Sequence, residues 1–271
     1  MRTFLLFMLI GSLAACGGDK DSGTTTTAST DDGCGDAPAP DGSGTTGGDY
    51  TPAKGTAAVK GVVKWDGKPP LRRTLDMGAD KYCAKCQDGS KKSKTTIVGP
   101  DGGLKDVFVH VKSGLKGWTF PAPTGDVILD QHECTYTPHM IGIRTGQTLR
   151  IRNSDPILHN VHAVNVKTKR DAFNIGQPKE GTEDTKSFRK PGFLSVKCDV
   201  HGWMSASICV VNHPFFRITG EDGAFALDKL PPGTYTIEAW HAKWGSQTQD
   251  VTVKEGETST VSFTFSKRKR S

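Results

Sequence analysis

The sequence predicts an all-β protein on two observations. Past residue 55, Gly and Pro punctuate short runs rich in Val, Ile, Thr and aromatic residues, and no long stretch has the apolar periodicity of a helix. Residues 147–152 alternate apolar and charged side chains, and residues 234–239 alternate in a similar way, as expected of strands with one buried face. This part of the chain is long enough for one or two β-sandwich domains.

The N-terminus has the layout of an export signal. Residues 1–15 carry one Arg, then an apolar run that is too short to span a bilayer, then small residues. The tetrapeptide ending at Cys16, Leu-Ala-Ala-Cys, resembles the bacterial lipobox, which implies a lipoprotein signal peptide and a lipidated Cys16. The alternative is an ordinary cleaved signal with an incidental Cys. Gly17, rather than Asp, favours the outer membrane by resemblance to sorted lipoproteins, so we expect a lipid-anchored envelope protein that faces the periplasm or the surface.

Residues 16–55 are mostly Gly, Thr, Ser, Asp, Ala and Pro, with almost no large apolar side chain. Such a segment cannot bury enough apolar surface to offset the entropy of ordering. We expect a flexible, disordered tether over these residues.

The charge pattern argues against nucleic acid as a partner. The formal net charge is +6, and basic residues are spread along the chain apart from the run at residues 267–270. Such a terminal run is most often a solvated tail, with contact to anionic lipid or to an acidic redox partner as the alternative.

A turn, a strand, a turn and a second strand follow one another in residues 218–241. This segment resembles the carboxypeptidase regulatory-like (prealbumin-like) β-sandwich. That family opens with a strand, a Gly-rich turn and a Pro, and residues 59–71 supply such an opening. The resemblance implies one sandwich made of residues 56–123 and 213–271, split around the residues between them. The alternative is three consecutive segments without this pairing.

The strongest chemical signal is Cys-x2-His-x2-Met at residues 198–204, between two runs typical of strands. One loop thus offers a thiolate, an imidazole and a thioether. A trigonal plane of two His and one Cys with a weak axial Met suits copper in both of its common oxidation states. We expect the second His from the neighbouring residues 153–162.

Residues 136–211 resemble a plastocyanin/amicyanin-type cupredoxin. They contain in the family's order a Gly-Gln turn, a strand ending in Asn, a His-Asn-Val-His run and the metal loop. The resemblance implies a Greek-key β-sandwich at residues 124–212 and a single type 1 copper ion. The ligands that it implies are His159, Cys198, His201 and the axial Met204. Gly202 departs from the family, because amicyanin has Pro there.

The resemblance also assigns roles to neighbouring side chains. Strand residues three apart point to opposite faces, so only one of His159 and His162 can face the metal, and the family pattern selects His159. We expect His162 to be a structural or surface residue and Asn160 to fix the ligand loop by hydrogen bonds. The family places the His201 edge at an exposed apolar patch, where we expect acid to protonate it in the Cu(I) state.

The remaining cysteines are Cys34, Cys83, Cys86, Cys134 and Cys209. Their number is odd, so at least one stays unpaired within the chain, and the sequence does not give the pairing. Cys83 and Cys86 have the thioredoxin spacing, but no alternating strands and helices surround them. We expect a structural role, with a bridge from one of them to Cys134 as a hypothesis.

Four other histidines do not indicate a second metal site, since none has a close ligand partner: His132, His139, His213 and His241. The strongest candidate among possible ligand pairs is Cys134 with His139, but a disulfide-bonded Cys and an ordinary strand His explain this pair more simply.

These features predict a membrane-anchored carrier of single electrons between redox proteins rather than an enzyme. A multicopper oxidase needs His-x-His pairs and a His-Cys-His motif, and a binuclear purple site needs Cys-x3-Cys; the sequence has none of these. The alternative is a copper store or chaperone. The regulatory-like sandwich contributes no catalytic residue and serves as a scaffold or docking surface.

Overall fold

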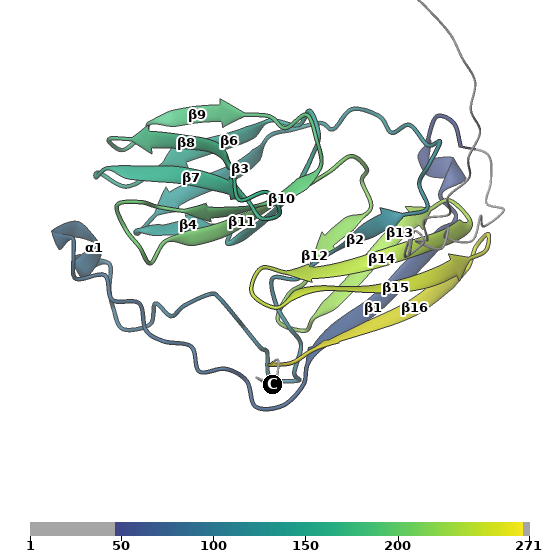
Figure 1. The fold of residues 1–271 in the computed structure, drawn as a ribbon, viewed down its shortest axis with the longest axis horizontal. Coiled ribbons are helices and arrows are strands. Elements are labelled where there is room, and N and C mark those ends of the chain that lie inside the picture. Colours follow the sequence, from purple (N-terminus) through teal and green to yellow (C-terminus); the bar gives the residue numbers. More distant parts are fainter. Residues whose placement is uncertain (1–46, 268–271) are drawn as a thin grey trace, which may run out of the picture. The chain divides into compact units, whose positions relative to one another are not determined.

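The computed structural model describes residues 47–267. The predicted signal peptide, the lipidation site Cys16, Cys34, most of the predicted tether and the basic residues 268–270 lie outside this part. Within it the prediction of an all-β fold is confirmed, with strands in four sheets (Figure 1). In the part of the chain described, no helix combines the length and the apolar character needed to cross a membrane.

The flanking sandwich is formed by strands from both ends of the described chain. One sheet has the order β13-β1-β16 and the other the order β12-β2-β14-β15. The strands are β1 (Ala57–Trp65), β2 (Phe108–Ser113), β12 (Phe216–Ile218), β13 (Ala224–Leu230), β14 (Gly233–His241), β15 (Gly245–Val253) and β16 (Thr258–Phe265).

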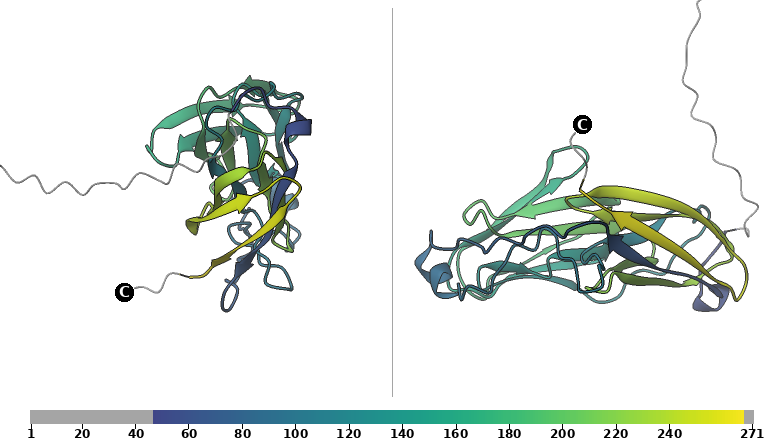
Figure 2. Two further views of the ribbon diagram at one scale, coloured as in Figure 1. Left: turned by 90° about the vertical axis from the view of Figure 1, so that its right-hand side faces the viewer. Right: turned by 90° about the horizontal axis from the view of Figure 1, so that it is seen from below.

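Strand β1 runs parallel to β16, with Ala58 opposite Thr258 and Trp65 opposite Phe265. In Figure 2 the purple start and the yellow end of the described chain accordingly lie in one sheet. Strand β1 also pairs antiparallel with β13, and β2 pairs with β12 and β14. Segments before residue 124 and after residue 212 therefore share both sheets of this sandwich.

The flanking sandwich begins earlier in the chain than the composition suggests. Tyr50, within the expected tether, is buried in the core, and its hydroxyl donates to the Lys229 carbonyl over 2.9 Å. Its ring contacts Phe215 edge-on at 5.5 Å. A short 3-10 helix, η1 (Pro52–Lys54), follows. One aromatic side chain thus supplies apolar burial that the surrounding polar composition conceals, and residues 47–55 differ from the expectation of disorder.

The central sandwich contains all remaining strands. Its sheets have the orders β5-β11-β10-β7-β8 and β4-β3-β6-β9. The strands are β3 (Val127–His132), β4 (Thr135–Thr137), β5 (Met140–Arg144), β6 (Leu149–Asn153), β7 (His159–Asn165), β8 (Asp171–Gln177), β9 (Glu183–Lys186), β10 (Gly192–Lys197) and β11 (Ser205–Val211).

The predicted alternation in β6 places Leu149 and Ile151 in the core of the central sandwich, both fully buried. Arg150 and Arg152 point the other way, and Arg152 pairs with Asp130 over 2.6 Å. Strand β10 lies between β7 and β11, and the β10–β11 hairpin returns beside the start of β7. This arrangement brings the predicted metal loop, residues 198–204, next to His159.

A long connection between β1 and β2 carries the helix α1 (Lys81–Lys85). The Asp80 carboxylate caps α1 by accepting from the backbone N–H groups of Tyr82 and Cys83 at 2.7 and 3.0 Å. A disulfide joins Cys83 to Cys134, in the turn between β3 and β4, so the hypothesis of a bridge to Cys134 is confirmed. We call residues 75–87 the cap segment.

Candidate metal centre

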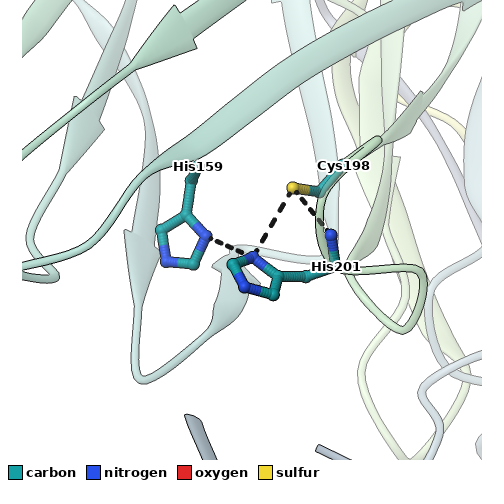
Figure 3. Close-up of side chains that lie close together, drawn as sticks. All are labelled: His159, Cys198 and His201. Atoms are coloured by element: carbon teal, nitrogen blue, oxygen red, sulfur yellow. Dashed lines mark hydrogen bonds between the residues drawn. The ribbon is translucent and has the colours of Figure 1, made fainter. Parts of the chain in front are cut away.

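Three buried side chains, His159, Cys198 and His201, converge beside the β10–β11 loop (Figure 3). Their ligand atoms all lie within 4.8 Å of one another. Nδ1 of His159 is 2.9 Å from Nδ1 of His201, which is 3.8 Å from Sγ of Cys198. The exposed fractions of the three residues are 0%, 3% and 3%. Two imidazole nitrogens and one thiol therefore face a common point that is shielded from solvent.

Strand β7 decides which histidine enters this group. His159, Val161 and Ala163 alternate along the strand and are all fully buried. His162 points to the other face, where its ring nitrogens lie 2.9 Å from carboxylate oxygens of Asp199 and Asp171. The two rings thus point to opposite faces, as the alternation predicts, and the structure brings His159 rather than His162 to the centre, as the family resemblance implies.

The loop after β10 presents Cys198 and His201 on one tight turn. The Met204 amide donates to the His201 carbonyl at 3.0 Å, and the Cys198 amide donates to the Met204 carbonyl at 3.3 Å. The His201 amide donates to Sγ of Cys198 at 3.3 Å. Because this bond favours negative charge on sulfur, it prepares Cys198 to act as a thiolate.

Asn160 ties β7 to the loop, as predicted. Its Oδ1 accepts from the Asp199 amide at 2.7 Å and lies 3.3 Å from Sγ of Cys198. Its Nδ2 donates to the Asp199 carboxylate at 3.2 Å and to Asn174 at 2.8 Å. These bonds hold the cysteine end of the loop at a fixed distance from His159.

Asp155, which was not predicted from the sequence, is a fully buried carboxylate next to His159. Its Oδ2 is 2.9 Å from Nε2 of His159 and accepts from the Cys134 amide at 2.8 Å, while Oδ1 accepts from the Glu133 amide at 2.7 Å. A carboxylate at Nε2 keeps a proton on that nitrogen and leaves the Nδ1 lone pair free to bind a metal. The sequence Asn-Ser-Asp-Pro around Asp155 is typical of a turn and does not point to a contact with His159. The Asp-x3-His spacing was the one feature of the sequence that could have indicated this contact.

The surroundings of Cys198 lower the pKa of its thiol. Burial opposes charge on Cys198, but hydrogen bonding by His159 and by nearby backbone groups lowers the pKa of the thiol below its usual value. Burial likewise opposes protonation of His159, and Asp155 and Cys198 outweigh it, so the pKa of His159 is raised. The metal-free pocket therefore eases loss of the thiol proton, and the thiolate is the state that binds a metal cation.

The prediction that the outer edge of His201 meets solvent is wrong. His201 is only 3% exposed. Atoms of Asp80 and Cys83, both in the cap segment, lie within 4.8 Å of its ring nitrogen, and the Trp203 ring lies 5.0 Å away. Burial and nearby His159 lower the pKa of His201. The covering residues lie far upstream in the sequence, so local reasoning about the loop could not find them.

Residues 204–266 match the carboxypeptidase regulatory-like domain family. This regulatory-like match contains β13 and β14, where the sequence analysis placed the resemblance. It begins at Met204 and so also includes β11 of the central sandwich. A comparison with curated proteins gave no match.

The chain is also similar to solved structures of cupredoxins. Amicyanin from Paracoccus versutus is 18% identical, with 38% of this chain and 96% of amicyanin covered and a TM-score of 0.29. A purple cupredoxin from Nitrosopumilus maritimus is 20% identical, with 31% and 99% covered and a TM-score of 0.27. A copper-containing nitrite reductase from Thermus scotoductus is 22% identical, with 33% and 23% covered and a TM-score of 0.27. These likenesses bear on the fold alone.

Met204, the predicted axial ligand, is 2% exposed and belongs to the same buried cluster as Cys198. The regulatory-like match and the metal loop thus meet at this residue.

Three of the other histidines use Nδ1 in contacts with the backbone. Nδ1 of His139 lies 2.9 Å from the Ser205 carbonyl, and the Nδ1 atoms of His213 and His241 accept from backbone amides. The structure does not bring them to the centre.

The residues present fit copper. Two imidazole nitrogens and the sulfur of a thiol with a lowered pKa converge in a buried pocket, with a buried thioether in the same loop region. Soft thiolate and thioether donors together with imidazole are the set that mononuclear electron-transfer copper sites use.

Proposed function

We propose that this chain is a blue-copper electron carrier in which His159, Cys198 and His201 hold one type 1 copper ion and Met204 is the weak axial ligand. The observation that carries the proposal is the convergence of two Nδ1 atoms and one Sγ within 4.8 Å in a buried pocket. Copper bound by this set supplies one-electron redox chemistry, because the donors suit Cu(I) and Cu(II) alike.

Hydrogen bonds from neighbouring residues restrict the movement of the proposed ligands. Asn160 fixes the loop to β7, Asp155 holds the proton on Nε2 of His159, and the His201 amide stabilises the Cys198 thiolate. Fixed ligands need little rearrangement when an electron arrives or leaves, which favours transfer over catalysis. We therefore propose a carrier rather than an enzyme, with one redox protein as donor and another as acceptor.

The absorption spectrum of the Cu(II)-loaded protein tests this function. We expect an intense blue or green band from thiolate-to-copper charge transfer. Cys198→Ser should remove the band, while Cys209→Ser, which alters a buried thiol of β11 outside the centre, should preserve it. A colourless Cu(II)-loaded protein would overturn the proposal.

A second candidate, a copper store or chaperone, is favoured by one observation: the cap segment covers His201. A covered site slows exchange with partners and suits retention of metal. Cycling the copper-loaded protein between oxidant and reductant separates the two. A carrier returns the same spectrum after each cycle, whereas a store holds Cu(I) that resists oxidation.

We further propose that Cys16 carries a lipid that anchors the protein in the cell envelope, with the outer membrane favoured. The basis is the Leu-Ala-Ala-Cys sequence that ends at this residue. We expect the native protein in the membrane fraction and Cys16→Ser in the soluble fraction. Cys34→Ser changes a cysteine of the same N-terminal region and should stay with the membrane. Retention of Cys16→Ser in the membrane fraction would contradict the anchor.

A further inference from the structure

Three sulfur-containing side chains pack together beside the proposed copper centre and take no part in it. Met77, Cys83 and Cys134 form a buried cluster in which every member is fully shielded from solvent. Cys86 and Trp203 pack against it. The bridge between Cys83 and Cys134 currently occupies two of the three sulfurs. This cluster joins the cap segment to the central sandwich.

The two bridge sulfurs lie next to the two imidazoles. Sγ of Cys83 is within 4.8 Å of a carboxylate oxygen of Asp80 and a ring nitrogen of His201, and Sγ of Cys134 is within 4.8 Å of Asp155 and His159. A sulfur in a disulfide is a poor metal ligand, whereas a thiolate is a strong one. The oxidation state of the bridge therefore decides whether this group can bind metal.

We propose that reduction of the Cys83–Cys134 bridge creates a second metal site that takes Cu(I). A dithiol reductant supplies two electrons: the bridge S–S bond breaks, each cysteine becomes a thiol, and the reductant's two thiols close into its own disulfide. On binding Cu(I), Cys83 and Cys134 release their protons and become thiolate ligands. The Met77 side chain, which packs in the same cluster, offers a thioether as a third sulfur donor.

The ligand chemistry favours Cu(I) over harder cations. Of the neighbouring imidazole nitrogens, Nδ1 of His159 and of His201 face the first centre, and Nε2 of His159 is bonded to Asp155. The new site therefore depends mainly on its two thiolates, with the thioether that Met77 offers and a ring nitrogen of His201 within 4.8 Å of Cys83 as further donors. Thiolate and thioether are soft donors that select Cu(I). The fully buried surroundings exclude the water that a harder cation would retain.

Contacts other than the bridge keep these sulfurs together after reduction. The Tyr82 hydroxyl donates to Asp155 at 3.2 Å, and the Trp203 indole donates to the Cys134 carbonyl at 3.0 Å. The Gln87 side chain accepts from the Met77 amide at 3.1 Å and so closes the cap segment on itself. The reduced site is held in place by these bonds rather than assembled from a loose loop.

The test uses Cu(I) alone as the probe on the full chain carrying Cys198→Ser, in which the first centre cannot form. Copper retained against a Cu(I) chelator is counted without oxygen, before and after reduction by a phosphine. We expect reduction to add one Cu(I) per chain, and this gain should disappear in the further variant Cys83→Ser/Cys134→Ser. The other thiols are present in both proteins, so any Cu(I) that they bind contributes equally to both counts.

Two additional variants guard against misfolding and misassignment. Met77→Leu keeps the bridge and nearly the same volume, and it should weaken retention of the added Cu(I). Cys86→Ser removes a neighbouring free thiol and should leave the gain intact. No gain on reduction, a gain that survives loss of Cys83 and Cys134, or a gain lost with Cys86 alone would each overturn the proposal. So would a preference for Zn²⁺ over Cu(I).

This site stands apart from the electron-transfer proposal, and the two can fail separately. The oxidised native protein reports the first centre through its colour, whatever the reduced bridge binds. The Cys198→Ser protein reports the second site through its Cu(I) count, even if the native protein is colourless.

Discussion

Asp155 and His159 form a fully buried carboxylate–imidazole pair, with Oδ2 of Asp155 2.9 Å from Nε2 of His159. The pair orients the imidazole so that Nδ1 faces Cys198 and His201 (Figure 3). Asp155 also anchors the turn that contains Cys134 by accepting from its amide. One carboxylate thus connects the proposed copper centre to the attachment point of the cap segment.

Asp155→Asn should weaken copper binding without removing it. An amide carries no charge and holds the His159 proton less firmly, and loss of such a partner typically costs about 10- to 100-fold in metal affinity. A competition titration with a copper chelator measures the change. Asp171→Asn is the matched control, because Asp171 is exposed and pairs with His162 rather than with a ligand. Equal losses in the two variants would contradict the role given to Asp155.

His159→Ala should abolish or remodel the copper spectrum, whereas His162→Ala should leave it nearly intact. The reason is that β7 directs the two rings to opposite faces, His159 into the core and His162 toward Asp171 and Asp199. Absorption spectra of the Cu(II)-loaded variants make the comparison. Similar loss of colour from both would show that the wrong histidine was assigned.

Substitutions of Met204 should move the reduction potential in opposite directions. Met204→Leu removes a donor that stabilises Cu(II) and makes the site more apolar, so the reduction potential should rise. Met204→Gln offers a harder oxygen donor that stabilises Cu(II), so the reduction potential should fall. Voltammetry beside thermal melts checks both variants. Unchanged potentials with a lowered melting temperature would identify Met204 as a packing residue only.

The stability that His213 and His241 contribute to the metal-free protein should fall as the pH drops below about 6.5. Burial lowers the pKa of His213 to about 3 and that of His241 to about 4, from an ordinary value of 6.5. Between pH 6.5 and these lowered pKa values, the two histidines bind protons in the unfolded chain but stay neutral in the folded protein. Stability contributed by the neutral rings is therefore present above pH 6.5 and is lost on acidification, at up to about 1.4 kcal/mol per pH unit for each histidine.

Melting temperatures between pH 8 and pH 4.5 check this dependence by comparison with variants. His213→Gln removes one of the groups and should flatten the slope below pH 6.5, while His132→Gln, which changes an exposed ring, should not. Parallel curves for the native protein and His213→Gln would contradict the assignment.

The sequence predicted features that depend on local pattern. Alternation placed Leu149 and Ile151 inside, and the same rule separated His159 from His162. The residues of the Cys-x2-His-x2-Met motif form one short loop, and this loop brings Cys198 and His201 together. These predictions succeed because strand geometry and short loops are set by neighbouring residues.

Features that depend on distant parts of the chain could not be predicted. The cap segment reaches His201 from far upstream through the Cys83–Cys134 bridge, and nothing in the loop sequence signals that cover. Asp155 acquires its role through amides of a turn that precedes it by some twenty residues. Tyr50 is a lone aromatic residue in a polar stretch, and its place in the core depends on contacts with distant residues such as Phe215 and Lys229.

The parallel pairing of β1 with β16 sets the order in which the molecule can be completed. Strand β1 is among the first elements of the described chain, yet its ladder partners β13 and β16 are contributed by residues beyond 223. The pairs of the central sandwich lie closer together in sequence and can form sooner. A nascent or truncated chain that ends before residue 258 therefore presents an open β1 edge, which invites pairing with other chains. Pairing of β16 with β1 therefore covers this edge last.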